Sequence, residues 1–169
     1  PLSLQAETGY EAWLRYAAID DPAVWARYRD MPASVVTLGD SAVLESAQDE
    51  LVRGIRGMLG RVIRVEDSLP GEGAFVLGRV DAVRRAVPEA SLPTDLAEDG
   101  FCLKTVRTGD QTHIVIAAPN DRGVLYGTFA LLRKIGLRQQ VSALHERHEP
   151  YAPVRWVNEW NNLNGTIER

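Results

Sequence analysis

The residues best suited to chemistry lie near the end of the chain, in segment 153–169. Trp156 and Trp160 are four positions apart around Asn158, so these three side chains would share one face if the segment were extended. An indole ring offers an apolar wall to the C–H face of a sugar, and a side-chain amide offers donors and acceptors to its hydroxyls. The segment is therefore typical of a carbohydrate-binding surface.

Other reactive side chains occur in settings that favour structural roles. Cys102 falls within an alternating strand pattern and is expected to be a small packed side chain. His113 also lies in mid-strand, with no second histidine or cysteine at ligand spacing. His145 and His148 stand three positions apart beside carboxylates, but the sequence offers no third convergent ligand. We therefore predict no metal site.

Composition narrows the class of protein. The chain has 169 residues, a formal charge of −4, 45% apolar residues and 25% charged residues, which is ordinary for a globular domain with its own core. Neither sign of charge forms a long block, so we expect no nucleic-acid partner and no membrane partner. The single cysteine excludes an internal disulfide framework and favours a reducing compartment. We expect a cytoplasmic or secreted protein, with the cytoplasm favoured.

Periodicity in the sequence predicts the elements that must position these residues. Strand patterns cover residues 34–39, 62–65, 74–78, 100–108, 111–118 and 154–160. Helix patterns begin at Pro22 and after Ser41, and cover residues 80–87 and 122–135. Gly109 and Asp110 separate two strands as in a tight hairpin. This order predicts an α+β fold, a two-layer α/β sandwich in which one mixed β-sheet carries its helices mainly on one face.

The apolar positions of the long helices indicate how they should pack on the sheet. Four helix residues are expected to contact three strand residues: Leu51, Ile55, Phe129 and Leu132 against Val35, Val76 and Ile114. Gly123 and Gly127 are four positions apart in the second long helix. Since glycine weakens a helix interior, we interpret them as a flat strip that lets the helix approach its neighbour closely.

Aromatic residues near the start of the chain are also expected to be buried. Trp25 and Tyr28 should lie on the inner face of the short helix that begins at Pro22. Upstream, aromatic residues recur every three positions, and their rings should turn inward: Tyr10, Trp13 and Tyr16.

Three stretches of the chain resemble the N-terminal portion of the α-glucuronidases of glycoside hydrolase family 67. They are Gly9-Tyr-Glu-Ala-Trp-Leu-Arg-Tyr16, Asp121-Arg-Gly-Val-Leu-Tyr-Gly-Thr-Phe-Ala-Leu-Leu-Arg133 and Val154-Arg-Trp-Val-Asn-Glu-Trp-Asn-Asn-Leu-Asn-Gly-Thr-Ile-Glu-Arg169. The last is the most specific, because the family pattern there is close to R-W-V-N-x-W-D-N-L-D-G-x-I-E-R. This chain departs from it at Asn161 and Asn164, where amides replace acids and lose their charge.

The resemblance implies two parts. Residues 1–150 would be a non-catalytic α/β accessory domain, similar to the one that precedes the barrel in β-hexosaminidases. Residues 151–169 would be a linker and the first strand of a truncated (β/α)8 catalytic barrel. Active sites of such barrels are assembled at the C-terminal ends of the strands, which would bring the end of this strand to the substrate. The substrate-binding residues are then expected to be Trp160, Asn158, Arg155 and Asn161.

The resemblance also implies a reaction. Enzymes of this family are inverting hydrolases that remove (4-O-methyl)glucuronic acid from xylo-oligosaccharides in xylan degradation, and inversion needs two carboxyl groups. Those of the family come from later barrel strands, so we expect no catalytic residue in this chain. Glu159 and Glu168 are interpreted as a barrel-lining or solvated side chain and a surface group. No cofactor is implied. The expected partners are glucuronoxylan-derived oligosaccharides and the chain's own barrel, and the resemblance is compatible with a homodimeric full-length enzyme.

Two alternatives stay open at this point. The chain could be a carbohydrate-binding module that uses Trp156 and Trp160 as a platform. It could also be a structural scaffold whose tryptophans only pack against a neighbouring domain. Titration with xylo-oligosaccharides would distinguish the two, because only the first predicts a saturable change in tryptophan fluorescence.

Overall fold

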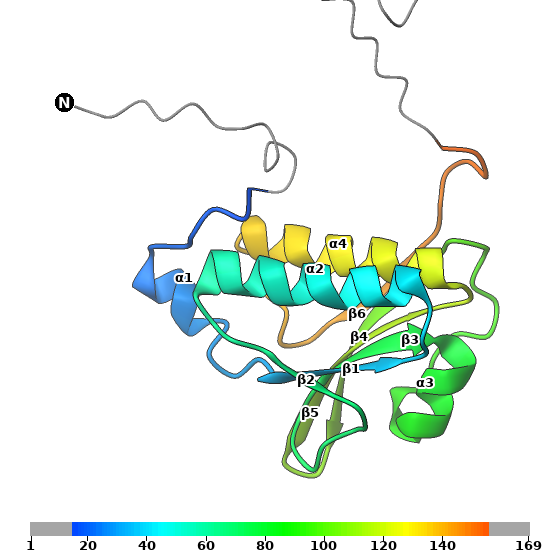
Figure 1. The fold of residues 1–169 in the computed structure, drawn as a ribbon, viewed down its shortest axis with the longest axis horizontal. Helices are drawn as coiled ribbons and strands as arrows, with labels where there is room; N and C mark the ends of the chain where they lie inside the picture. Colours follow the sequence, from blue (N-terminus) through cyan, green and yellow to red (C-terminus); the bar gives the residue numbers. More distant parts are fainter. Residues whose placement is uncertain (1–14, 156–169) are drawn as a thin grey trace, which may run out of the picture.

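A six-stranded mixed β-sheet organises the chain (Figure 1). The computed structural model describes residues 15–155. The strands are β1 (Ser34–Leu38), β2 (Arg64–Glu66), β3 (Phe75–Arg79), β4 (Phe101–Thr108), β5 (Gln111–Ala118) and β6 (His145–His148). Their order is β2-β1-β3-β5-β4-β6. The first four in this order run parallel, whereas β4 pairs antiparallel with β5 and β6. The predicted mixed sheet with helices is confirmed.

Two long helices, α2 (Ala42–Leu59) and α4 (Asp121–Gly136), lie side by side across one face of the sheet (Figure 1). The shorter elements are α1 (Pro22–Ala26), α3 (Val80–Ala86) and the 3₁₀ helix η1 (Pro88–Ala90). Two caps define the ends of α2: the Ser41 hydroxyl accepts the N–H of Leu44 at 3.2 Å, and Gly60 ends the helix with a φ of 64°. No helix among residues 15–155 has both the length and the apolar character needed to cross a membrane.

Alternation along the strands divides the core into two clusters. Phe75 and Leu77 of β3 pack with α2 and α4, together with Leu51 and Ile55. Val76 lies in the opposite cluster, with residues of α3 and η1. The predicted contact of Val76 with the long helices is therefore wrong. Side chains of a strand alternate between faces, and both neighbours of Val76 already occupy the helix face.

Two aromatic residues were also misassigned by the sequence patterns. Trp25 is 38% exposed, whereas Val24 and Tyr28 are buried, because the single turn of α1 buries an i, i+4 pair. The indole still donates to the carbonyl of Leu59 at 3.0 Å. Phe129, expected to contact the sheet, is half-buried and lines surface grooves instead.

Two strands differ from the predictions, one in its bounds and one in its existence. β2 lies at Arg64–Glu66 instead of 62–65, and Val62 is exposed. β6 falls in a segment, His145–His148, that the patterns did not mark as a strand. Its residues are polar and it forms one edge of the sheet, so it has no apolar alternation to reveal it. Most of the predicted strand 154–160 lies outside the described residues.

The glycine strip on α4 has the predicted effect. A Cβ added at Gly127 would lie 2.7 Å from Cγ2 of Ile116, and one at Gly123 would lie 2.6 Å from the carbonyl oxygen of Gly100. No side chain fits at these distances. The strip therefore brings α4 directly onto the sheet and onto the loop before β4, which positions the site described below.

Cys102 and His113 have the structural roles predicted for them. Cys102 is buried in the apolar cluster beneath α3, and burial raises the pKa of its thiol. Nδ1 of the buried His113 accepts the N–H of Ala74 at 3.2 Å. Burial lowers the pKa of this imidazole, so it is held as a neutral acceptor that links β5 to the start of β3.

Candidate functional site

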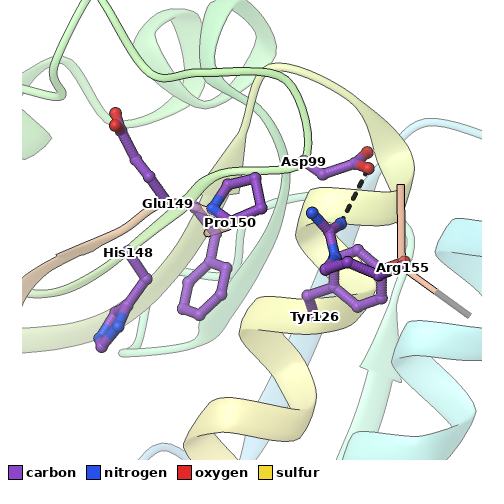
Figure 2. A pocket seen from close by; sticks show the side chains of 7 residues that line it. Asp99, Tyr126, His148, Glu149, Pro150 and Arg155 are labelled. Atoms are coloured by element: carbon purple, nitrogen blue, oxygen red, sulfur yellow. Dashed lines mark hydrogen bonds and ion pairs between the residues drawn. The ribbon is translucent and has the colours of Figure 1, made fainter. Parts of the chain in front are cut away.

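A pocket of about 500 Å³ opens where the chain leaves the sheet after β6 (Figure 2). Its lining comes from the loop before β4, the first residue of β4, α4, the last residue of β6 and the segment after β6: Asp99, Phe101, Tyr126, His148, Glu149, Pro150 and Arg155. The pocket thus lies between the sheet and the segment that leads out of the described residues.

Asp99 is the centre of the polar contacts around this pocket. Its side chain is only 7% exposed, and it accepts three hydrogen bonds: from Asn120 Nδ2 at 2.8 Å, from Arg122 Nε at 3.0 Å and from Arg155 Nη2 at 3.0 Å. Burial by itself would raise the pKa of Asp99, but the three donors outweigh it and hold the pKa below its ordinary value. The carboxylate is therefore ionised and fully engaged.

Local backbone geometry explains how Asp99 comes to point at α4. Asp99 has a φ of 62°, a left-handed conformation that Asp tolerates better than most residues. The N–H of Gly100 closes the turn on the carbonyl of Ala97 at 2.9 Å. Asn120 then acts twice: its Oδ1 caps α4 by accepting the N–H of Gly123 at 2.9 Å, while its amide donates to Asp99. The cap of α4 and the loop before β4 are thereby joined.

Arg155 closes the pocket from the outgoing segment. Its Nη1 donates to the carbonyl of Ala152 at 2.7 Å, and its Nη2 donates to Asp99. The guanidinium also lies over the ring of Tyr126, 5.3 Å from the centroid, in a cation–π contact (Figure 2). Three interactions of different kinds thus fix one side chain of the segment after β6.

A second group of charged side chains, upstream of Arg155, also connects the segment after β6 to the loop before β4. Arg147 of β6 donates to Asp95 Oδ1 at 2.8 Å and to Glu149 Oε1 at 3.0 Å. Glu149 also accepts the N–H of Ala97 at 3.4 Å, and Arg147 together with this N–H lowers the pKa of Glu149. The loop before β4 is therefore tied to the segment after β6 at two places, through Asp99 and through Glu149.

His148 contributes a flat wall to the pocket. Its ring stacks on Phe101 with centroids 4.9 Å apart and an interplanar angle of 21°. Its Nε2 lies 3.0 Å from Oε2 of Glu146, whose other oxygen contacts Nζ of Lys134 at 2.8 Å. His145 lies three positions away on the same strand, so the two imidazoles are on opposite faces and do not converge.

No metal centre is formed by the part of the chain that the structure describes. Within residues 15–155, no group of three or more His, Cys, Asp or Glu side chains is arranged to hold an ion. The carboxylates of the pocket are also poorly suited to acid catalysis. A glycosidase acid needs a raised pKa, whereas the pKa values of Asp99 and Glu149 are both lowered by their partners. The arrangement is suited to holding a chain segment in position.

The predicted substrate residues fall mainly outside the region that can be described. Trp160, Asn158 and Asn161 lie beyond residue 155, and the structure gives no account of them. Arg155 lies at the end of the described region and contacts Asp99 and Tyr126. Whether it also orients a substrate stays a prediction.

Sequence reasoning missed Asp99 as a candidate site residue. The pair Asp99-Gly100 is a turn signal that could have marked the position. No spacing rule, however, links Asp99 to Arg122 or Arg155, which are 23 and 56 positions away. Their convergence is a product of the tertiary fold.

Comparison with known proteins shows which family this chain belongs to. The model of the family described as "Glycosyl hydrolase family 67 N-terminus" matches residues 12–131. The α-glucuronidase A of Emericella nidulans is 34% identical over 174 residues, and the α-glucuronidase of Hypocrea jecorina is 35% identical over 176 residues. Each match covers 97% of this chain and 20% of the relative. The chain thus spans about a fifth of the length of these relatives.

A solved structure with a similar fold is that of a GH115 4-O-methyl-α-glucuronidase with specificity for decorated arabinogalactans. The TM-score is 0.51 at 15% sequence identity, and the match covers 70% of this chain and 18% of the other. At this identity the comparison supports the fold alone.

Proposed function

We propose that this chain, which belongs to glycosyl hydrolase family 67 as its N-terminal domain, is the non-catalytic part of a longer α-glucuronidase. The relatives named above are α-glucuronidases about five times as long as the matched segment, which supports the proposal. The lowered pKa values of Asp99 and Glu149 support it as well, because neither group is suited to be the acid of a glycosidase.

The proposed reaction is the inverting removal of (4-O-methyl)glucuronic acid from xylo-oligosaccharides. Its two carboxyl groups would be supplied by the longer protein outside this chain. Residues 1–150 would form the accessory domain, and residues 151–169 the linker and first strand of a catalytic (β/α)8 barrel. Trp160, Asn158 and Asn161 would then contribute to the substrate wall at the C-terminal end of that strand.

The observation that carries this proposal is the fixation of Arg155 by Asp99 and Tyr126. A barrel needs its first strand held in a defined direction if residues at the far end are to meet a substrate. The contacts of Arg155 supply such a fixed point at the beginning of the proposed strand. We therefore propose that the domain serves its enzyme by anchoring this strand, and that Arg155 acts mainly as that anchor.

The partners and location follow from the same proposal. Glucuronoxylan-derived oligosaccharides would reach the protein through the catalytic part, and the closest physical partner of this domain would be its own barrel. Homodimerisation of the full-length enzyme is a further proposal, as is a cytoplasmic or secreted location with the cytoplasm favoured. Sedimentation of the longer protein and fractionation of cells that express it would test them.

The test is to read the gene beyond the codon of Arg169, to express the longer protein that the proposal expects, and to follow its reaction with aldouronic oligosaccharides by ¹H NMR. We expect several hundred further residues, because the relatives are about five times as long as the matched segment. The first-formed glucuronic acid should be the β-anomer, because inversion at an α-linkage gives that product. An initial α-anomer would contradict the inverting mechanism, and a product without glycosidase activity would contradict the proposal as a whole.

A further inference from the structure

A groove of about 480 Å³ lies between the C-terminal halves of α2 and α4, whereas Asp99 contacts the first turn of α4. Its lining is largely apolar and includes Tyr16, Met58, Phe129, Leu132, Gly136 and Leu137. Leu137 is 57% exposed and Phe129 is half-buried. An apolar groove of this size between two core helices is a feature that a protein normally covers.

The groove is hollow because α4 carries a glycine at its floor. Among residues 15–155, a Cβ added at Gly136 would meet only Sδ of Met58, at an ordinary contact distance of 3.6 Å. This glycine differs from Gly123 and Gly127, where an added Cβ would clash with the sheet or the loop beside it. The packing of the described residues therefore does not require a glycine at position 136. A glycine there does leave room for a side chain from another part of the chain.

The N-terminal segment enters the described structure at the edge of this groove. Tyr16 crosses α2 above Gly57, where an added Cβ would lie 2.9 Å from the Cβ of Tyr16. The Tyr16 hydroxyl donates to Glu50 at 2.8 Å, and the N–H of Ile19 donates to the carbonyl of Met58 at 2.8 Å. These contacts fix the position and direction from which residue 14 must continue.

We propose that the groove is the docking site of segment 10–14 and that the indole of Trp13 is the side chain that fills it. Because one residue spans at most about 3.6 Å, the Cα of Trp13 lies within about 7 Å of that of Arg15, which itself lines the groove. An aromatic ring buries roughly 150–250 Å² on docking, which suits a single apolar groove of this size.

Charge and family comparison favour this occupant. Arg15 and Arg133 line the groove, whereas residues 1–14 contain Glu7 and Glu11 and neither Lys nor Arg. The family match also begins inside the segment, at residue 12. The segment thus acts as a strap across α2 and α4, and it stabilises their packing at the end remote from Asp99.

The test uses the full 169-residue chain with Trp13 as its sole tryptophan, after replacing Trp25, Trp156 and Trp160 by phenylalanine. Docking predicts a blue-shifted emission and a quenching constant for acrylamide at least about threefold lower than in urea, because the ring is enclosed. The variant Gly136→Phe in this background fills the groove from within and should restore most of the quenching. Ser46→Phe adds the same ring at an exposed position of α2 and should leave Trp13 protected.

Three results would overturn the proposal. Trp13 could be quenched in the native chain as strongly as in urea, or protected equally in the Gly136→Phe variant. Protection could also disappear on dilution as a dimer dissociates in sedimentation, which would assign the groove to a second copy of the chain. If Gly136→Phe does not fold by circular dichroism, Leu137→Glu replaces it, since an exposed residue that lines the groove then carries a charge.

Discussion

Arg155 donates to Asp99 with 3.0 Å between Nη2 and Oδ2, across 56 positions of sequence. The same carboxylate accepts the amide of Asn120, which caps α4, and the guanidinium of Arg122 in the first turn of that helix. One buried group therefore joins the outgoing segment, the loop before β4 and the start of α4. These contacts hold the segment after β6 against the loop before β4 and the first turn of α4.

Asp99→Asn should destabilise the 169-residue chain by roughly 1–3 kcal/mol, because two charge-assisted hydrogen bonds lose their anionic acceptor. Urea unfolding at neutral pH measures the loss. The matched control is Glu98→Gln: Glu98 is 80% exposed and lies 3.5 Å from Arg122, so its substitution should change stability by less than about 0.5 kcal/mol. Equal losses in the two variants would show that Asp99 has no special role.

The contribution of Asp99 should also depend on pH in a defined direction. Its folded pKa lies below the ordinary value of 3.8, so the ionised form is favoured by folding. The stabilisation is then fully present above pH of about 4 and is lost as the pH falls through the folded pKa. The difference in unfolding free energy between the wild type and Asp99→Asn should stay constant from pH 7 to pH 5 and shrink below pH 4. A difference that already vanishes near pH 6 would contradict this account.

Gly127→Ala should destabilise the chain although alanine is the better helix former. The new Cβ would lie 2.7 Å from Cγ2 of Ile116, and such overpacking costs about 1–3 kcal/mol, more than the gain of about 1 kcal/mol in helix propensity. Gly136→Ala in the same helix meets only Met58 among the described residues, at 3.6 Å, and should cost less stability than Gly127→Ala. Thermal unfolding of both variants checks the pair, and a stabilising Gly127→Ala would refute the close approach of α4 to the sheet.

His113→Gln should weaken the loss of stability on mild acidification. The folded pKa of His113 lies below its ordinary value of 6.5, so the imidazole stays neutral in the native state while the unfolded chain takes up a proton. Stability is therefore fully present above pH 6.5 and falls toward the lowered folded pKa, with a slope of at most about 1.4 kcal/mol per pH unit from this group. Urea titrations at pH 7, 6 and 5 should show a flatter profile in the glutamine variant. If unfolding free energy changes with pH in parallel in the wild type and in His113→Gln, His113 is not the cause of the loss of stability.

Cys102 should be inert toward a thiol reagent until the chain unfolds. The side chain is buried and burial raises the pKa of the thiol, so both access and thiolate formation are suppressed. Reaction with DTNB should be slow in buffer and should accelerate in urea in parallel with loss of the circular dichroism signal. The exposed thiol of a Ser46→Cys variant provides the control for reagent activity. Rapid native labelling at Cys102 would contradict the packed position.

Much of the fold could be predicted because local signals and tertiary structure agree. Ser41, Gly60 and Asn120 occupy the caps that their side chains or conformations favour, and Gly109-Asp110 forms the hairpin turn. The errors arose where packing decides. The partner face of Val76 depends on the register of β3, and β6 has a polar sequence whose strand conformation is imposed by β4.

The candidate site was less predictable for a similar reason. The functional hypothesis rests on segment 153–169, whose composition around Trp160 is distinctive. Most of that segment lies beyond the described residues. Asp99 looked like an ordinary loop acid. Its role follows from the left-handed turn at Asp99 and from the long connection that returns Arg155 to it, and neither is a local pattern.

The most direct test of the central claim compares glucuronic acid release from aldouronic oligosaccharides by the 169-residue chain and by the longer product of its reading frame, at equal molar concentration. The account predicts release by the longer protein and none by residues 1–169, whose described pocket carboxylates are held ionised by their partners. Release by the 169-residue chain alone would contradict the account.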